Sequence, residues 1–336
     1  MALRSYILKR ILTTLLTIFI IITLNFIIFD VMPGSPINTF LQPGKIKDPD
    51  QLEAIKKAFG LDQPPHIRYL IYVKNMLTFN LGISYRNQKP VAVEMSERLL
   101  NTFLLVGVST ILSMVVGIIV GVYTAYKRGS TFDSGAVLFS LTFYSLPSFW
   151  IGMVLLMIFS VYLGWFPIAG ATPREWGQPE IWPTPPQWPQ DWLEILRGRL
   201  YHMALPVLAL FLFQVGGYIL LTRAVMIETL TDDYILTARA KGLSERVVLF
   251  RHALKNGSLP LITNIALSFA FMFSGAIITE QVFTYQGMGW WIWNSISSRD
   301  YPVLQGVFYV LALCVVAANF LADLVYGFID PRIKYG

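Results

Sequence analysis

The residues best suited to chemistry in this chain form a basic segment between two long apolar stretches. The segment, TARAKGLSERVVLFRHALKNGSLP, covers residues 237–260. Five cations stand there against the single acid Glu245: Arg239, Lys241, Arg246, Arg251 and Lys255. Such a cluster can bind an anionic surface, and the positive-inside rule predicts that it faces the cytoplasm. We therefore expect a cytoplasmic partner to act on the chain here.

The first part of this segment carries the signals of a short helix. Asp232 and Asp233 can cap a helix that begins at Tyr234, because their carboxylates accept hydrogen bonds from free amide groups. Gly242 can end the helix in the left-handed conformation. A helix of two to three turns is unstable alone in water. It must therefore pack against something, and we expect its free side to remain exposed.

A second helix follows, with Ser244 as its predicted cap and Gly257 as its terminator after Asn256. One apolar stripe on it is expected to pack against the inner ends of the protein's own spans: Leu243, Val247, Phe250 and Leu254. Two short helices joined by a glycine turn favour a socket for a soluble protein. The alternative is an amphipathic helix that lies on anionic lipid.

Several kinds of chemistry are not indicated. The sequence has no Gly-x4-Gly-Lys-Ser/Thr loop, so work driven by ATP requires another subunit. The histidines His66, His202 and His252 lie in different loops, and no Cys or His cluster has zinc spacing. The lone Cys314 is best explained as a small buried residue. We expect no enzyme activity, no bound cofactor and no metal site in this chain.

The composition of the 336 residues is that of a membrane protein, with 55% hydrophobic and 14% charged residues. About 20 apolar residues cross the roughly 30 Å hydrocarbon core as a helix. Six segments qualify: residues 8–32, 102–126, 136–163, 204–223, 261–282 and 303–328. The first is too long for a signal peptide and is expected to be retained. The predicted fold is an all-α integral membrane protein with six transmembrane helices.

Charge predicts the orientation of these spans. With both termini in the cytoplasm, the inner segments hold 13 of the 26 Lys and Arg residues and the two short outer loops hold four. This topology accounts for most of the net charge of +6, so nucleic-acid binding is not expected. It predicts an N-terminal helix at 1–32, an extracytoplasmic region at 33–101 and a five-helix core at 102–336. That core includes an outer loop at 164–203 and a cytoplasmic loop at 225–258.

Isolated polar residues lie in or beside the spans. They can form hydrogen bonds between helices or line a polar pathway. The candidates for pathway lining are Asn101, Gln214, Asn264 and Ser268. The outer loop contains seven prolines and the tryptophans Trp165, Trp176, Trp182, Trp188 and Trp192. These tryptophans either form a membrane belt or, carried into solvent, a rigid platform for a binding protein or a stacking substrate such as a sugar.

The cytoplasmic segment also carries a family resemblance. Ala238, Ala240, Gly242 and the pair Leu259-Pro260 resemble the EAA loop of ABC importer permeases, in which a short coupling helix fits a groove on the ATPase. The strings TARAKGLS, RHALKN and LP are similar to the dipeptide and oligopeptide branch. The resemblance implies this set of coupling residues: Asp233, Tyr234, Thr237, Ala238, Arg239, Ala240, Lys241, Gly242 and Leu243.

Three further stretches resemble the same branch: SLPSFWIG at 145–152, residues 280–306, and LVYGFIDPRIKYG at the C-terminus. The long first outer region, with FGLD and LGISY, resembles the B-type permease. The resemblance implies a type I importer permease in the inner membrane, paired with a C-type permease, two ATPases that hold ATP and Mg, and an extracytoplasmic binding protein. It implies an outer gate or binding-protein contact at Glu280, Gly287, Gly289, Trp290, Arg299 and Asp300.

The expected cargo is a dipeptide or oligopeptide. Oligosaccharides and nickel chelates remain alternatives within the same machinery. An ion-coupled secondary carrier and a non-transporting scaffold or receptor are the alternatives of a different class.

Overall fold

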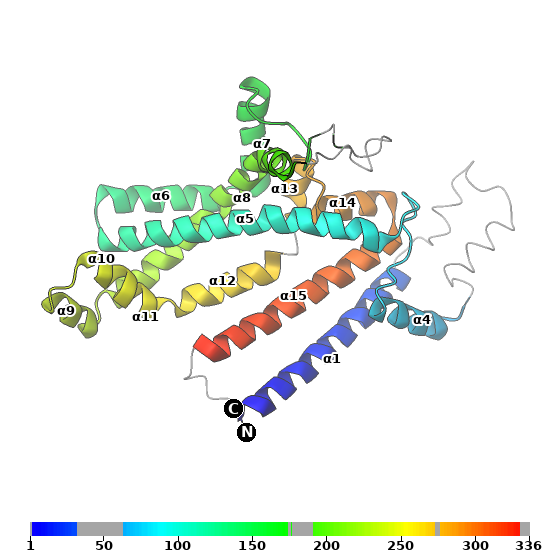
Figure 1. Cartoon of the computed structure of the whole chain (residues 1–336), viewed down its shortest axis with the longest axis horizontal. Coiled ribbons are helices and arrows are strands. Elements are labelled where there is room, and N and C mark those ends of the chain that lie inside the picture. The colour runs from blue at the N-terminus through cyan, green and yellow to red at the C-terminus, as the bar shows by residue number, and fades with distance from the viewer. Residues whose placement is uncertain (1, 32–62, 174–175, 177–190, 273–275, 330–336) are drawn as a thin grey trace. The chain divides into compact units, whose positions relative to one another are not determined.

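The computed structural model describes residues 2–31, 63–173, 176, 191–272 and 276–329, and this part of the chain is almost entirely helical. Its only β pairing is one isolated antiparallel bridge between Ile83 and Pro90. The prediction of an all-α protein is confirmed for these residues. The chain forms two compact units, a terminal unit of Met1–Leu100 with Met288–Gly336 and a central unit of Asn101–Gly287 (Figure 1).

The terminal unit is built on two long apolar helices. They are α1 (Ala2–Val31) and α15 (Tyr301–Ile329), and they run antiparallel. Asn25 Nδ2 donates to the Gln305 carbonyl oxygen at 3.0 Å, and the Phe29 and Tyr301 rings lie 6.4 Å apart. The shorter helices α4 (Pro65–Leu77) and α14 (Met288–Ser298) complete the unit, together with the first turns of α5 (Val91–Tyr126).

The central unit contains most of α5, which packs beside α8 (Trp192–Thr229). Both helices are long, and glycines let them approach. A Cβ at Gly121 would lie 2.5 Å from the Thr222 Cβ atom. The same close approach joins α8 to α6 (Thr131–Ser145), because a Cβ at Gly216 would lie 2.5 Å from the Ser140 carbonyl oxygen. Small residues allow this dense packing where lipid supplies no hydrophobic drive.

The helix predicted across 136–163 is interrupted, so the prediction of one continuous span is wrong here. After α6 the chain bends by 99° into α7 (Ser148–Leu155) and the π-helix η1 (Leu156–Tyr162). Pro147 causes the break, because its ring disfavours helical backbone at Leu146, whose ψ is 137°. Ser148–Leu155 then packs against α8 and α13 (Ile277–Val282).

Four helices in the described residues are long and apolar enough to cross a membrane, or up to five if the bent pair counts as one span. The predicted span at 261–282 is not one of them: α12 (Leu259–Met272) and α13 flank three residues outside the described part. Two helices begin earlier than predicted, α5 at Val91 and α8 at Trp192. The full count of six spans and the side on which the termini lie remain predictions.

Most of the proline-rich outer loop lies outside the described residues, including Trp182 and Trp188. The described tryptophans of this loop divide. Trp192 is 67% exposed, but Trp176 is only 5% exposed, because its ring fills the space beside Gly198 on α8. The expectation that surrounding prolines carry Trp176 into solvent is therefore wrong. A glycine of α8 provides the room for it.

Candidate functional site

The predicted short helix is present as α9 (Asp233–Ala240). Asp232 occupies the N-cap position with extended backbone, although its side chain makes no capping hydrogen bond. Gly242 has a φ of 75°, and its amide donates to the Arg239 carbonyl oxygen at 2.9 Å. The helix begins one residue before the predicted Tyr234, the left-handed Gly242 is confirmed, and the predicted capping bond of Asp232 is absent.

One side of α9 is buried in the protein's own core. Ile235 is 0% exposed and Ala238 is 5% exposed. They share a cluster with buried residues of α5, α8 and the following helix: Val122, Ala125, Met226, Val248, Leu249 and Ala253. This packing supplies the stability that a helix of eight residues lacks alone. It also fixes which side of α9 faces outward.

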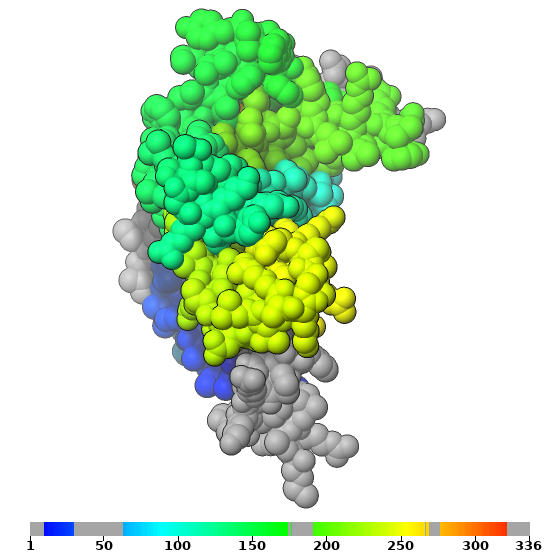
Figure 2. Space-filling model, turned by 90° about the vertical axis from the view of Figure 1, so that its left-hand side faces the viewer, coloured from blue at the N-terminus to red at the C-terminus, as the bar shows by residue number. Residues whose placement is uncertain are grey.

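The outward side of α9 combines apolar, small and basic residues. Its exposed members, with those of the turn after it, also include one acid, and they are Asp233, Tyr234, Leu236, Thr237, Arg239, Ala240, Lys241, Gly242 and Leu243. Leu236 is 59% exposed, the most of the large apolar residues among them. In Figure 2 the yellow atoms of this segment lie on the face turned towards the viewer. Exposed apolar patches mark surfaces that interact with another protein or with a membrane.

The predicted second helix is a single run of α10 (Glu245–Val247), the π-helix η3 (Val248–Leu254) and α11 (Lys255–Gly257). The predicted stripe is partly wrong. Val248, Leu249 and Ala253 are the buried residues, whereas Leu243 is 38% exposed. Phe250 and Leu254 are partly buried against the same cluster, as predicted. The wider π-turn explains the difference, because it changes which residues share a helix face.

Gly257 does not act as the predicted left-handed terminator, since its φ is not positive. Its role is close packing. A Cβ at this position would lie 2.5 Å from Thr229 Oγ1 and 2.8 Å from Val225 Cγ1, both on α8. The absence of a side chain thus lets α11 lie directly against the C-terminal end of α8. A force on α9 would pass to α8 through this contact and the shared apolar cluster.

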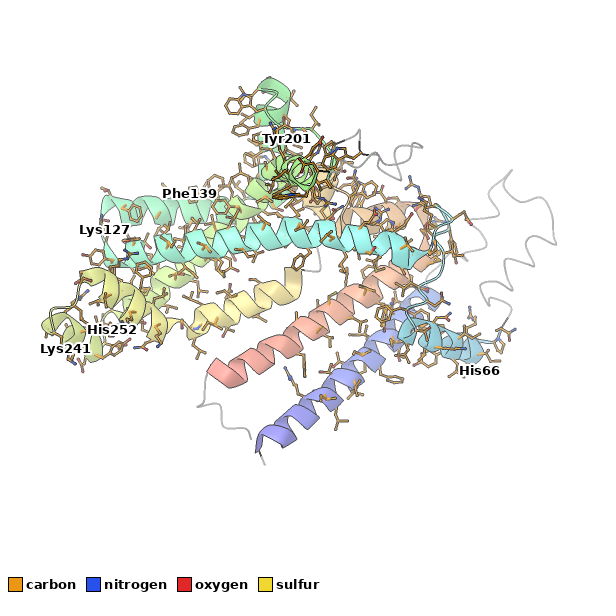
Figure 3. All side chains as sticks on the ribbon, viewed as in Figure 1. His66, Lys127, Phe139, Tyr201, Lys241 and His252 are labelled. Carbon is orange, nitrogen blue, oxygen red and sulfur yellow. The ribbon has the colours of Figure 1, made fainter. Side chains whose placement is uncertain are left out.

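The basic character of the segment is exposed. Arg239 makes a two-pronged ion pair with Glu245 across the glycine turn, with Nε to Oε1 at 3.1 Å and Nη2 to Oε2 at 3.3 Å. Lys241, Arg246 and Arg251 are exposed, and within the described residues none of them forms an ion pair. Lys127, Lys241 and His252 lie at the same end of the central unit (Figure 3). An anionic partner suits this end.

A second polar contact ties two helices together at this end. Arg223 of α8 donates to Asp133 in the first turn of α6, with Nε to Oδ1 at 2.6 Å and Nη2 to Oδ2 at 2.9 Å. The Gly129 amide also donates to Asp133 Oδ2, at 2.9 Å. The bidentate geometry fixes α6 against α8.

The four predicted pathway residues differ in their surroundings. Asn101 is buried, donates to the Gln286 carbonyl oxygen at 2.8 Å and accepts from Arg199 at 3.0 Å. Gln214 accepts from Thr110 at 3.1 Å. Ser268 accepts from Tyr218 at 2.8 Å and donates to the Asn264 carbonyl oxygen. Only Asn264 has an exposed side chain. Three of them thus bridge helices, and a pathway role stays a prediction.

The predicted outer-gate residues of the central unit form an internal contact. Glu280 of α13 is 0% exposed, and its Oε1 accepts from Thr102 Oγ1 at 2.7 Å. A Cβ at Gly287 would collide with both side chains. Glu280 therefore joins α13 to α5 and has no surface to offer a partner in this conformation. Burial places its function inside the unit.

The predicted residues of the terminal unit also divide into buried and exposed ones. Gly289 and Trp290 lie on the buried side of α14. Asp300 is 2% exposed and accepts from Ser84 Oγ at 2.5 Å, from the Tyr85 amide at 3.0 Å and from the Arg86 amide at 3.2 Å. Arg299 beside it is exposed, with a φ of 54°.

Tyr85, in the turn held by Asp300, is a neutral part of this contact. Burial raises the pKa of the Tyr85 hydroxyl, and the Asp300 carboxylate and Tyr301 add to that rise. The hydroxyl therefore carries no charge at physiological pH, and it cannot act as a pH switch for the turn.

Sequence reasoning missed three of these features: the Asp133–Arg223 pair, the packing role of Gly257 and the turn at 84–86 captured by Asp300. Each depends on residues far apart in the chain, and spacing carries no signal for such contacts. A weak signal existed for Arg223, an arginine at the end of an apolar span, where a buried partner is expected.

Two family models cover the chain. Residues 117–335 match "Binding-protein-dependent transport system inner membrane component". Residues 3–106 match the N-terminal region of the same kind of membrane component. The chain is also 36% identical over 332 residues to the oligopeptide transport system permease protein AppB of Bacillus subtilis, covering 98% of this chain and 99% of the relative.

Other relatives agree. The dipeptide transport system permease protein DppB of Escherichia coli is 36% identical over 338 residues, with 98% of this chain and 99% of the relative covered. The MetNI methionine ABC transporter in an inward-facing conformation shares the fold, with a TM-score of 0.51 at 15% identity, over 72% of this chain and 98% of that chain. The chain belongs to the family of inner-membrane components of binding-protein-dependent transport systems, the multi-pass permease subunits of ABC importers.

Proposed function

We propose that this chain is the B-type permease subunit of an ATP-driven importer of dipeptides or oligopeptides. The permease proteins AppB and DppB, to which it is similar along nearly its whole length, carry those substrate classes in their names. The chain supplies half of the translocation pathway and a C-type permease supplies the other half. Asn101, Gln214, Asn264 and Ser268 are the proposed pathway residues, and Asn264 is the most accessible of them.

The α9 surface carries this proposal. Ile235 and Ala238 anchor the helix in the protein's own core, and Leu236, Ala240 and Lys241 face outward. A short helix held rigidly with an exposed apolar and basic face is suited to insertion into a groove of a second protein. We assign that groove to a cytoplasmic ATPase subunit that holds ATP and Mg. Two such subunits serve the permease pair.

Transmission then follows from the contacts behind α9. When the two ATPases close on ATP, the docked helix moves with them as a rigid body. The cluster around Ile235 and the contact of Gly257 with Thr229 pass that motion to α8. The bidentate pair of Arg223 with Asp133 carries α6 along. The motion then reaches the outer ends of α8 and α5. There Asn101 forms buried hydrogen bonds with α8 and with the loop after α13, and Glu280 of α13 forms a buried hydrogen bond with α5.

In this proposal the termini and the loop at 225–258 lie in the cytoplasm, and residues 33–101 lie on the outer side. An extracytoplasmic solute-binding protein delivers the cargo there. Gly289, Trp290, Arg299 and Asp300 are the proposed outer-gate or binding-protein contact residues of the terminal unit, and Glu280 and Gly287 are those of the central unit.

The test is uptake by proteoliposomes that contain the permease pair with and without the ATPase subunits. Peptide should enter only when both ATPases, internal ATP and the loaded binding protein are all present. Uptake that persists without the ATPases, driven by an ion gradient, would identify a secondary carrier and contradict the proposal. Binding of an oligosaccharide or a nickel chelate instead of peptide by the cognate binding protein would keep the machinery and change the cargo.

A further inference from the structure

The outer turn of the terminal unit is held in one shape by several hydrogen bonds. The Ser84 amide donates to the Lys89 carbonyl oxygen at 2.9 Å, and the Gln88 amide donates back to the Ser84 carbonyl oxygen at 3.0 Å. Gln88 adopts a φ of 57°, which a residue with a side chain rarely does. The surrounding contacts must therefore hold this turn in place.

Asp300 is the main one of those contacts. Its carboxylate receives the Ser84 hydroxyl and the amides of Tyr85 and Arg86, and it is almost fully buried. These three donors satisfy the carboxylate inside the unit. Asp300 is consequently a positioning residue that joins the turn to the junction of α14 and α15.

Three cations come from the two segments that Asp300 joins. Arg86 and Lys89 come from the turn, and Arg299 precedes Asp300. All three side chains are exposed, and within the described residues none of them makes an ion pair. Like charges gathered in this way repel one another unless an anionic group approaches.

Two exposed apolar side chains lie on α14, the helix that ends just before Arg299. Trp293 is 50% exposed and Ile296 is 53% exposed, although the other side of α14 is buried. Ile296 lies one turn from Arg299, because the Arg299 amide donates to the Ile296 carbonyl oxygen at 3.2 Å. Protein interfaces commonly combine an aromatic anchor with a charged rim.

We propose that Arg86, Lys89, Arg299, Trp293 and Ile296 form a docking surface for the acidic face of the extracytoplasmic solute-binding protein. We call it the basic docking patch. The inference rests on the proposed function, since it assigns a partner and the chemistry of recognition to the outer side of the importer. It also assigns different roles to two neighbouring residues. Arg299 contacts the partner, whereas Asp300 holds the turn in position inside the terminal unit.

Charge favours this occupant over a segment of the same chain. The stretch at 45–62 has four lysines, Lys45, Lys47, Lys56 and Lys57, against four acids, Asp48, Asp50, Glu53 and Asp62. A balanced segment offers no net attraction to three cations. A separate protein with a surplus of carboxylates does, and long-range attraction would also speed its encounter with the permease.

The backbone of Arg299 allows a sharp test. Its φ of 54° favours glycine, so R299G removes a cation and relieves strain in one change. Q88G is the matched control, because Gln88 has a similar φ of 57° and no charge. Both variants should keep or raise the melting temperature of the purified permease. Only R299G should weaken binding-protein affinity, by roughly threefold to tenfold.

The decisive measurement is the affinity of the cognate binding protein for the whole transporter in lipid nanodiscs. The triple variant R86E/K89E/R299E should lose at least about tenfold in affinity, and the wild-type affinity should fall as salt rises from about 50 to 300 mM. The control K74E reverses an exposed cation on α4 and should bind normally. If the triple variant binds the binding protein with unchanged affinity, and Q88G and R299G bind it equally well, the patch proposal is wrong.

Two further measurements distinguish failure of the patch from failure of the proposed function. ATPase co-purification and basal ATP hydrolysis test the proposed function itself, and both should be unchanged in the triple variant. If the wild-type complex shows neither ATPase co-purification nor basal ATP hydrolysis, the proposed function is wrong, and this result does not bear on the patch. If the triple variant alters adhesion to anionic vesicles and leaves binding-protein affinity intact, the cations recognise lipid headgroups and the docking proposal is wrong.

Discussion

Arg223 and Asp133 form a bidentate ion pair that holds α6 against the C-terminal end of α8, with nitrogen to oxygen distances of 2.6 and 2.9 Å. The Asp133 side chain is 6% exposed and that of Arg223 is 26% exposed, so water screens the pair only in part. The pair adjoins the helices that carry the coupling segment. It is therefore placed to keep the inner end of the central unit rigid.

A double-mutant cycle measures this pair. D133N and R223Q should each lower the free energy of unfolding in detergent, and the coupling between them should be about 1–3 kcal/mol. Coupling below roughly 0.3 kcal/mol would mean that the pair behaves like an exposed surface bridge. Thermal unfolding of the four proteins, followed by intrinsic fluorescence, supplies the numbers.

The close packing around Gly257 predicts that one added methyl group lowers the stability of the protein. G257A places a Cβ against Thr229 Oγ1 and Val225 Cγ1, and overpacking of this kind costs about 1–3 kcal/mol. The control is G135A, also in a helix, where a Cβ meets no atom within 4 Å. G135A should unfold at or above the wild-type temperature.

A compensating substitution at Thr229 tests whether the close packing of Gly257 also supports coupling to ATP hydrolysis. The combination G257A/T229A removes the nearest colliding atom and should recover part of the lost stability and of the substrate-stimulated ATP hydrolysis. Equal stability of G257A and G135A would contradict a close contact between α11 and α8.

Glu280 predicts an effect that no surface residue would have. T102V removes the hydroxyl that donates to the buried carboxyl group, which should cost about 1–3 kcal/mol. G287A should be at least as harmful, since its methyl group would collide with Glu280 and Thr102. Thermal stability and ATP hydrolysis stimulated by the binding protein are the measurements. Full retention of both in T102V would show that the contact is dispensable.

Asp300 predicts an indirect effect on docking. S84A and D300N each remove part of the hydrogen bonding that holds the turn, so Arg86 and Lys89 should lose their fixed positions. Binding-protein affinity should fall although neither residue touches the partner. Addition of R299G to D300N should then weaken binding further. If D300N binds with wild-type affinity, the turn does not depend on its carboxylate.

Preferences of single residues for helix ends and turns predicted much of the structure of residues 232–245. The residue types at Asp232, Gly242 and Ser244 predicted where α9 starts, where it ends and where the next helix begins, because such preferences act within a few residues. Neither Asp232 nor Ser244 makes the predicted side-chain capping bond, however. The buried face of the second helix did not follow, because the π-turn at Val248–Leu254 changes the helical period. Gly257 was read as a terminator, since its close neighbours Thr229 and Val225 lie about 30 residues earlier in the chain.

The outer residues illustrate the same limit. Motif position singled out Glu280, Arg299 and Asp300 as one group, but burial separates them into two internal contacts and one exposed cation. Pro147 signalled a break in its helix, yet apolar composition alone suggested a continuous span. Hydropathy reports length and lipid compatibility and is blind to a bend.

The central claim is that the outward face of α9 receives the ATPase. A240D adds a charge to that face, and N256D adds the same charge to an exposed position of α11 outside it. Substrate-stimulated ATP hydrolysis by the assembled transporter in nanodiscs, measured together with ATPase co-purification, tests the claim most directly. We predict that A240D lowers the stimulated rate at least about tenfold while membrane insertion persists, and that N256D stays near wild type. Equal, near-wild-type rates for A240D and N256D would contradict the account.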